Sequence, residues 1–432
     1  MKQRFAKLTR NLCWRAVDKL LSGKWWRGDV HAFIEEWTGY SRYELREDAE
    51  NNGQISVKLK AQITDELAMV AEDMVDGIMH GIDPDFNPVE SRPRKDGLSG
   101  KIRDIACLDI RHQMLGHLVK LGIDDLLRAR ILPTQHASIP HRGQTGLTRQ
   151  VRRYLNRKLG IRCYVKTDCT AAYASTQYKD IIDKILLREI PRARWIIACM
   201  YTLARYAPGG HLIIGGYLDA WLFNLVMSYA LRYVLSLAKY RRFIRQPMVV
   251  AVITYMDDGL MLGRSRSSLK TAVGHLAAWL WATYHISMRT TTGIILLESI
   301  AQEKSRKHAA KRAARHPPLI DMGGYRICRT FVAIRRKNVT RVLRCFVRAW
   351  RELKALGTLK RQRACQVISR FGMIANADSY QLCHGYHVFS VVKVAKRIQG
   401  YWARITRRDR KETNRNALEK YRIKCAAYCR AS

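Results

Sequence analysis

Two apolar segments separated by a short polar turn form the clearest pattern in the chain. The first, residues 248–254, is rich in Val and Ile, and the second covers residues 259–263. Their length and β-branched composition predict two strands joined by a tight turn. The turn is Tyr255–Asp258, so two neighbouring carboxylates, Asp257 and Asp258, lie at the tip of the predicted hairpin.

A second run of alternating polarity, residues 162–168, predicts a strand that ends at Asp168. The residues after it, through Ile181 and Leu186, have the apolar spacing of a helix. Residues 1–90 predict amphipathic helices. Further helices are predicted over residues 63–79, 113–130, 148–158 and 271–283 and from 338 to the end, with a strand over 285–288.

Residues 212–238 are apolar enough to be compared with a membrane span. Asp219, Asn224 and Arg232 interrupt this segment, and several glycines precede it. Charged groups are costly in a bilayer, so the pattern favours a buried loop and helix in a soluble core.

Composition limits the class of partner. The 432 residues are 47% hydrophobic, enough for more than one subdomain, and carry a formal net charge of +41. Such a charge indicates a polyanionic partner, with nucleic acid as the first candidate. A membrane surface is not expected, because the basic residues are spread over many segments and not gathered on one amphipathic helix.

The eleven cysteines leave two interpretations open. The first residues, Met1–Arg4, lead into a mixed polar pattern that lacks the apolar core of a signal peptide. We therefore expect reduced thiols in a cytoplasmic protein. Cys425 and Cys429 are spaced for zinc binding but lack a clear partner pair, so packing or surface cysteines are the favoured interpretation.

The carboxylates Asp168, Asp257 and Asp258 form the candidate chemical site. Adjacent aspartates on a turn repel each other, and a hard cation such as Mg²⁺ relieves that repulsion. Three carboxylates on two adjacent strand ends can hold two cations roughly 3.5–4 Å apart, as phosphoryl and nucleotidyl transfer require. A polar turn without chemistry is the alternative for the tetrapeptide alone.

These two segments resemble the A and C motifs in the palm of a reverse transcriptase, of which Tyr255–Asp258 is a usual form. The resemblance implies that Asp168, Asp257 and Asp258 are catalytic. It also implies that they bind two Mg²⁺ ions, with Mn²⁺ as an alternative and Cys169 among the metal-contacting residues.

Other motifs follow in the family's order. Lys101 and Arg103, in a Ser-Gly-Lys-x-Arg-x-Ile segment, resemble fingers residues that contact the incoming nucleotide, as does Arg142 in a loop before a basic helix. Solvated surface positions are the alternative for all three. Tyr173 stands where the family has an aromatic ring that rejects a 2′-hydroxyl; without the family it is a core aromatic.

Gly215, Asp219 and Asn224 resemble motif B, which supports the templating base and the nucleotide. The family usually has Ser-Gln or Ser-Pro where this chain has Asp219-Ala220, and the extra carboxylate puts ordinary template handling in doubt. In the motif D region the nearest cation is Arg289, and a guanidinium is a poor proton donor, so no role is assigned to it.

Gly323, Gly324 and Tyr325 resemble motif E, the primer-grip hairpin. The remaining chain is basic with interleaved aromatic residues, which suits a thumb that binds a template–primer duplex. The implied fold is α+β, a right-hand polymerase. Its expected parts are a helical extension (1–90), fingers (91–160), palm (161–330) and a basic helical thumb with a tail (331–432).

The resemblance implies an RNA-directed DNA polymerase that adds dNTPs to a primer 3′-hydroxyl. Stand-alone prokaryotic relatives occur in retrons, diversity-generating elements and phage defence, so we expect an associated non-coding RNA template, a DNA product and a role in antiphage defence. A mobile-element role, weakly templated or protein-primed synthesis, and a non-catalytic RNA-binding protein on a polymerase scaffold remain alternatives. The oligomeric state is open.

Overall fold

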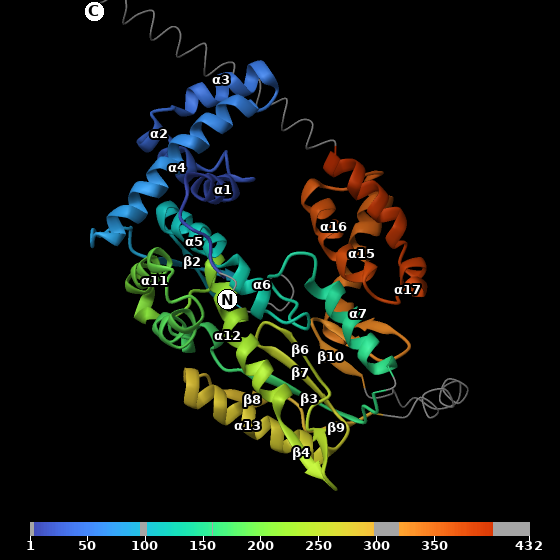
Figure 1. The fold of residues 1–432 in the computed structure, drawn as a ribbon. Coiled ribbons are helices and arrows are strands. Elements are labelled where there is room, and N and C mark those ends of the chain that lie inside the picture. The colour runs from blue at the N-terminus through green and yellow to red at the C-terminus, as the bar shows by residue number, and fades with distance from the viewer. Residues whose placement is uncertain (1–3, 96–101, 158, 298–318, 401–432) are drawn as a thin grey trace, which may run out of the picture.

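The computed structural model describes residues 4–95, 102–157, 159–297 and 319–400. Helices dominate both ends of this α+β chain, and antiparallel strands lie between them (Figure 1). Within these ranges no helix is long and apolar enough to cross a membrane. The apolar segment 212–238 instead forms a loop and helix α12 (Tyr217–Ser236), in which most residues are buried, as its sequence predicts.

Four helices build the N-terminal part: α1 (Arg10–Leu21), α2 (Gly28–Thr38), α3 (Arg42–Asn52) and α4 (Val57–Met79). The side chains of Thr9, Ser41 and Ser56 accept hydrogen bonds from the first turns of α1, α3 and α4 and so fix where these helices begin. Helix α1 packs against α4 and against α5 (Ile110–Gly122), which joins this layer to the rest of the molecule.

The central sheet is antiparallel, with strand order β6-β7-β3-β8 and β9 also paired with β3. Its strands are β3 (Cys163–Cys169), β6 (Ala251–Tyr255), β7 (Asp258–Gly263), β8 (Met288–Thr290) and β9 (Ile295–Leu296). Helix α13 (Arg266–Tyr284) contacts β3, β7 and β8, whereas α7 (Gly143–Asn156) contacts β6.

The sheet separates two hydrophobic cores because successive strand residues point to opposite faces. Val165, Val252 and Met261 belong to one core, together with α5, α12, α13 and the N-terminal helices. Tyr164 and Ile253 belong to the other, which contains α7 and the C-terminal elements. Because of this alternation, both hydrophobic cores pack on the same central sheet, one on each face.

Between the N-terminal helices and the sheet lie a small sheet and a helical layer. Strands β1 (Glu90–Lys95) and β2 (Ile102–Cys107) form an antiparallel pair. The helical segments are α6 (Asp124–Arg130), α8 (Ala172–Ser175), α9 (Tyr178–Ile181), a π-helical turn (Ile182–Leu186), α10 (Leu187–Glu189), α11 (Arg194–Tyr206) and a 3₁₀ turn (Pro208–Gly210). A separate hairpin joins β4 (Ala238–Arg241) to β5 (Ile244–Pro247).

The C-terminal part begins with a three-stranded sheet and continues as helices. The strands are β10 (Ile320–Met322), β11 (Tyr325–Ile327) and β12 (Val332–Ile334). The helices are α15 (Arg336–Leu356), α16 (Arg361–Ala375) and α17 (Tyr380–Gly385), followed by helical residues 388–400. In Figure 1 these helices stand opposite the N-terminal helices across the upper part of the molecule.

Several predicted elements are wrong in their limits. The helix expected over 113–130 is divided at Ile123 into α5 and α6. The strand expected over 285–288 begins only at Met288, because His285 has φ +56° and ends α13. Trp25 and Trp26 lie in a turn after α1 and are not on a helix face. Strand β1 was not predicted, since Pro93 and the charges around it are typical of a turn.

The described cysteines are all free thiols. Cys425, Cys429 and the basic run 303–316 lie outside the described residues.

Candidate active site

Three carboxylates lie at one end of the central sheet, as predicted. The antiparallel strands β3 and β7 pair at Thr167 and Gly259. Asp168, which comes after Thr167, and Asp258, which comes before Gly259, are therefore the next residues toward this end of the sheet. The β6–β7 hairpin closes with a two-residue loop after the pair Tyr255–Asp258, and Asp257 is in that loop. The loop residue Met256 has φ +55°, a left-handed conformation that is uncommon for a side chain of this size.

Two cations neutralise two of these acids. Lys166 Nζ lies 3.1 Å from Asp258 Oδ1. Arg289 donates to Asp168 Oδ2 from Nη2 at 2.9 Å and from Nε at 3.2 Å. Sequence reasoning missed Lys166, although its position two residues before Asp168 places both side chains on one face of β3.

The pKa values of Asp257 and Asp258 are raised by burial and by neighbouring carboxylates. Burial raises the pKa of Asp257, and the neighbouring Asp168 raises it further. Burial also raises the pKa of Asp258, while Lys166 lowers it. Burial, together with Asp257 and Asp168, raises the pKa of the Cys169 thiol to about 12, so this side chain is an uncharged thiol and a poor ligand for a hard cation.

The donor set has the chemistry of a magnesium site, but its present arrangement is one of ion pairs. Carboxylate oxygens are the ligands that Mg²⁺ prefers, and a cation relieves the repulsion that raises the pKa of Asp257. Within the described ranges, no three His, Cys, Asp or Glu side chains are grouped closely enough to hold a metal ion. Arg289 binds Oδ2 of Asp168, so a cation at that oxygen has to displace the guanidinium.

Tyr173 and Arg103 lie beside these acids. The Tyr173 ring stacks on Phe223, with centroids 5.5 Å apart, and its hydroxyl lies 3.9 Å from Met256 Sδ in the β6–β7 loop. Burial raises the pKa of Tyr173, as do two nearby acids, whereas Arg103 lowers the pKa of both Tyr173 and Asp257. The structure thus brings together Tyr173, Arg103 and Asp257 among the predicted site residues. Lys101 lies outside the described residues.

Asp219 is buried inside the protein. Its side chain is 2% exposed and accepts hydrogen bonds at Oδ1 from the Tyr178 hydroxyl (2.9 Å) and from Ile213 N (2.8 Å). Burial raises its pKa to about 6, although both hydrogen bonds oppose the rise. A Cβ at Gly216 would overlap its carboxylate. The acid that departs from the family pattern thus secures the loop before α12.

Gly215 supports the small sheet at the same loop. It has φ +112°, and a Cβ there would lie 2.9 Å from Ile105 Cγ2 and 3.2 Å from the Ala106 carbonyl oxygen. Ala106 N also donates to the Ile214 carbonyl. Gly215 lines a cleft of about 570 Å³ whose other lining residues include Arg27, Arg92 and Arg94.

Asn224 links three segments that are far apart in sequence. Its Nδ2 donates to the Ala137 carbonyl (3.1 Å) and lies 3.9 Å from Met256 Sδ in the β6–β7 loop. Its own carbonyl accepts from Gln135 Nε2 at 2.7 Å. Gln135 is fully buried and was not singled out from the sequence, because nothing local distinguishes a buried glutamine from one in a surface loop.

Arg142 holds the loop that precedes α7. Its Nη1 donates to the carbonyls of Leu132 (2.6 Å) and Gln135 (2.9 Å), and burial lowers its pKa. The guanidinium is thus partly engaged by the protein's own backbone.

The hairpin between β10 and β11 turns at Gly323 and Gly324, which have φ +58° and +87°. A Cβ on Gly323 would lie 2.6 Å from Leu147 Cδ2 of α7, so the turn packs closely on that helix. Tyr325 is fully buried and its hydroxyl donates to the Met373 carbonyl of α16. The tyrosine side chain therefore belongs to the core, and the turn is the accessible part of this motif.

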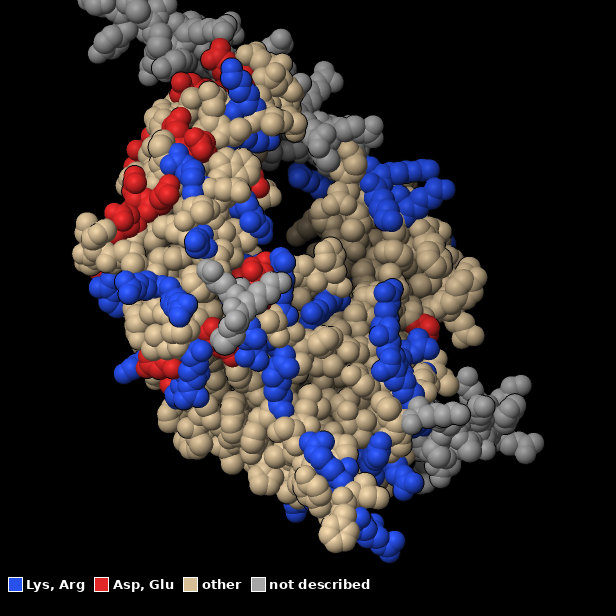
Figure 2. Space-filling model, viewed as in Figure 1, with Lys and Arg blue, Asp and Glu red and all other residues tan. Residues whose placement is uncertain are grey.

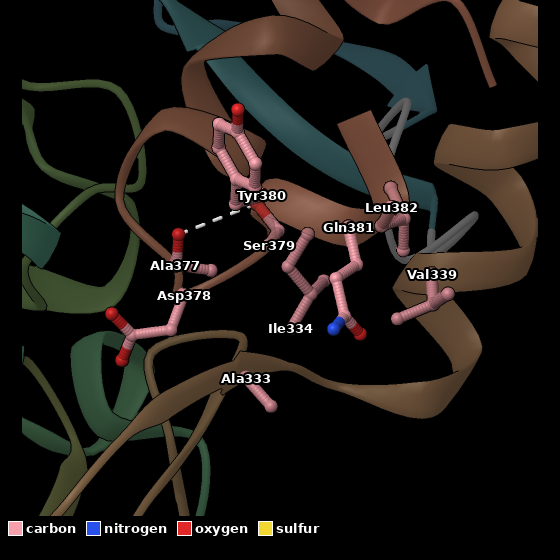
Figure 3. A pocket seen from close by; sticks show the side chains of 9 residues that line it. All are labelled: Ala333, Ile334, Val339, Ala377, Asp378, Ser379, Tyr380, Gln381 and Leu382. Atoms are coloured by element: carbon pink, nitrogen blue, oxygen red, sulfur yellow. Dashed lines mark hydrogen bonds between the residues drawn. The ribbon is translucent and has the colours of Figure 1, made fainter. Parts of the chain in front are cut away.

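A cavity of about 540 Å³ lies away from the acids, among β12, α15 and the residues before α17 (Figure 3). Its lining includes Asp378, which accepts a hydrogen bond from Val332 N, and Tyr380, but no Lys or Arg. It lacks the cations that a triphosphate requires.

Part of the chain matches a family of known proteins. The family described as reverse transcriptase (RNA-dependent DNA polymerase) matches residues 93–289, which contain all three acids, Arg103 and Tyr173. No curated protein matches the chain.

Proposed function

Because residues 93–289 form a reverse transcriptase domain, that of an RNA-directed DNA polymerase, we propose that the acids at the end of β3 and at the β6–β7 turn are its catalytic centre. The observation that carries the proposal is the strand register, which sets Asp168 beside the Asp257-Asp258 turn. The effect of Asp168 on the pKa of Asp257 supports the same grouping.

Asp168, Asp257 and Asp258 hold two Mg²⁺ ions in this proposal, with Mn²⁺ as a substitute. Such ions activate the primer 3′-hydroxyl for attack on the α-phosphate of a dNTP and hold the leaving pyrophosphate. Arg103 binds the triphosphate as a cation beside Asp257. Tyr173, fixed by its stacking on Phe223, excludes a nucleotide that carries a 2′-hydroxyl.

The elements fit a right-hand polymerase. The central sheet with α12 and α13 corresponds to the palm, β1–β2 and α5–α7 to the fingers, and α15–α17 to the thumb, with α1–α4 as an N-terminal extension. The parts at 1–90, 91–160, 161–330 and 331–432 stay predictions within this proposal. Gly323 and Gly324 then present the primer grip between α7 and the thumb helices.

The biological setting that we propose is prokaryotic antiphage defence, with a non-coding RNA as template. The net charge of +41 supports a stable complex with RNA. Mobile-element or diversity-generating synthesis uses the same chemistry. Phage plating on bacteria that carry the intact gene or the Asp257→Ala, Asp258→Ala gene separates these settings: defence requires that the mutation restores plaques.

A non-catalytic RNA-binding protein is the second candidate, since Lys166 and Arg289 already neutralise two of the three acids. Weakly templated synthesis is a third outcome. Sequencing of co-purified nucleic acid distinguishes all three, using the wild type, the Asp257→Ala, Asp258→Ala variant and a control with two exposed acids of α4 removed, Asp73→Ala, Asp76→Ala.

A defined RNA in all three preparations, with complementary DNA only in the wild type and the control, supports templated reverse transcription. RNA without DNA in every preparation supports the binding protein. DNA of restricted base composition without a matching RNA supports weakly templated synthesis.

A further inference from the structure

The β4–β5 hairpin projects from the end of the central sheet that lies opposite the catalytic turn. It ends at Pro247, four residues before β6 begins at Ala251, and β6 then runs to Tyr255 beside the acids. At about 3.3 Å per residue, β6 separates the two ends by roughly 16 Å. In Figure 1 the hairpin is the lowest described part of the molecule, away from the N-terminal and C-terminal helices.

The tip of this hairpin exposes large apolar side chains. Phe243 is fully exposed, and Tyr240 and Ile244 are 74% and 65% exposed. The pair Arg241–Ile244 closes a two-residue loop of Arg242 and Phe243. An isolated group of exposed apolar side chains at the end of a two-stranded projection contributes little to its own fold, so it is a candidate interaction surface.

The loop has an unusual conformation for its residues. Arg242 has φ +50° and Phe243 has φ +63°. Tight hairpin loops with two positive φ values favour Asn-Gly, because larger side chains adopt this conformation less easily. The chain thus places a cation and an aromatic ring at the two positions where a purely structural turn favours small residues.

The same hairpin is strongly basic. Lys239, Arg241, Arg242 and Arg245 lie within it, and no Asp or Glu occurs between Asp219 and Asp257. None of the four cations forms an ion pair within the described part of the chain, although Arg245 Nη2 donates to the Ser236 carbonyl and fixes the base of the hairpin. Lys and Arg side chains gather at this lower end in Figure 2, whereas acidic side chains gather at the upper left over the N-terminal helices.

We propose that the β4–β5 hairpin is a second RNA-binding site, which binds unpaired nucleotides of an RNA outside the catalytic cleft. The cations contact phosphates, and Tyr240 and Phe243 stack on exposed bases. An RNA-directed polymerase necessarily meets a long polyanion, and the separation along β6 means that the hairpin contacts a part of the RNA other than the one being copied. An anionic membrane has partly similar chemistry and is an outcome of the test.

The test uses the full chain and measures dissociation constants for labelled oligouridine RNA, an RNA duplex of the same length, and phosphatidylserine-containing vesicles. The stacking variant is Tyr240→Ala, Phe243→Ala, Ile244→Ala, and its conservative counterpart is Tyr240→Phe, Phe243→Tyr. The matched control is Trp281→Ala, which removes an exposed aromatic side chain (59%) from α13.

We expect the stacking variant to bind oligouridine at least about tenfold more weakly, because each stacked base contributes strongly to binding. Its affinity for duplex RNA stays nearly unchanged, and the conservative variant and Trp281→Ala bind as the wild type does. Arg241→Gln, Arg242→Gln lowers the slope of log affinity against log salt by up to about 1.4, at roughly 0.7 for each lost phosphate contact with a single strand.

Extension of a short primer–template is expected to be normal in every hairpin variant, so failure of this proposal is distinct from failure of the proposed catalytic site. Oligouridine affinity equal to that of the wild type in the stacking variant overturns the proposal. So does a loss of vesicle binding with unchanged RNA affinity, which assigns the hairpin to a membrane surface.

Discussion

Replacement of Asp219 by Asn should make the protein more stable above neutral pH. Asp219 is 2% exposed, and among the described residues its carboxylate has no cationic partner; the carboxylate accepts hydrogen bonds from the Tyr178 hydroxyl and from Ile213 N. An amide oxygen accepts both bonds equally, so Asp219→Asn keeps the geometry of the loop before α12 while removing a buried charge.

The magnitude follows from the pKa. Burial raises the pKa of Asp219 from 3.8 to about 6, and a shift of about two units at 1.36 kcal/mol each corresponds to about 3 kcal/mol. The folded state binds the proton more tightly than the unfolded state does. The contribution of Asp219 to stability is therefore greatest below pH 3.8 and falls as the pH rises to about 6, whereas the amide of the variant does not titrate.

Urea unfolding of both proteins at pH 4.5 and pH 8 tests the reasoning. The free energy of unfolding of the Asp219→Asn variant, relative to the wild type, should increase by about 2 kcal/mol between these pH values, because about 1 kcal/mol of the full effect is already present at pH 4.5. Asp183→Asn is the matched control, because Asp183 accepts a hydrogen bond from Tyr201 at the surface and its replacement should change this pH dependence little. An equal pH dependence in Asp219→Asn and the wild type would refute the assignment of a raised pKa.

Three further predictions concern the site. Arg289→Gln frees Asp168 from its cation and should tighten Mg²⁺ binding several-fold, measured by terbium luminescence and by Mg²⁺ titration of dNTP incorporation; unchanged affinity would show that the ion pair does not compete. Gly215→Ala should lower the free energy of unfolding by about 1–3 kcal/mol because the added Cβ meets β2, whereas Gly274→Ala, in an open helical position, should raise it by up to about 1 kcal/mol. Thermal unfolding of both variants and the wild type tests this, and equal melting temperatures would contradict it. Tyr173→Ala should raise incorporation of rNTP relative to dNTP by about tenfold or more, as a ratio of kcat/KM, and an unchanged ratio would exclude a gating role.

Local pattern was sufficient for the elements that carry the acids. The apolar runs on either side of Tyr255–Asp258 predicted β6 and β7, and the alternation before Asp168 predicted β3. In each case the residues that fix the element are neighbours in sequence, so a short window contains the signal.

Long-range contacts were out of reach of the same reasoning. The burial of Asp219 depends on Tyr178 and Ile213 and on the packing of α12. The sequence pattern did not show which face of this helix is buried. The ion pair of Lys166 with Asp258 requires the register of β3 with β7. Strand β1 exists because β2 lies beside it, and its own charged sequence is typical of a turn. Partners distant in sequence decide each of these features.

Asp219 and Asp257 both have a raised pKa, but the causes differ and indicate a structural role for one and a chemical role for the other. Burial alone raises the pKa of Asp219. The hydrogen bonds from Tyr178 and Ile213 need only an oxygen acceptor, so an amide stabilises the fold at least as well. Burial raises the pKa of Asp257 and the neighbouring Asp168 raises it further, although backbone N–H groups of the hairpin turn oppose the rise. Repulsion between like charges that persists in a folded protein is typical of a functional site, where stability is given up for reactivity. The grouped acids are therefore the candidate functional site, whereas the buried acid holds the loop before α12.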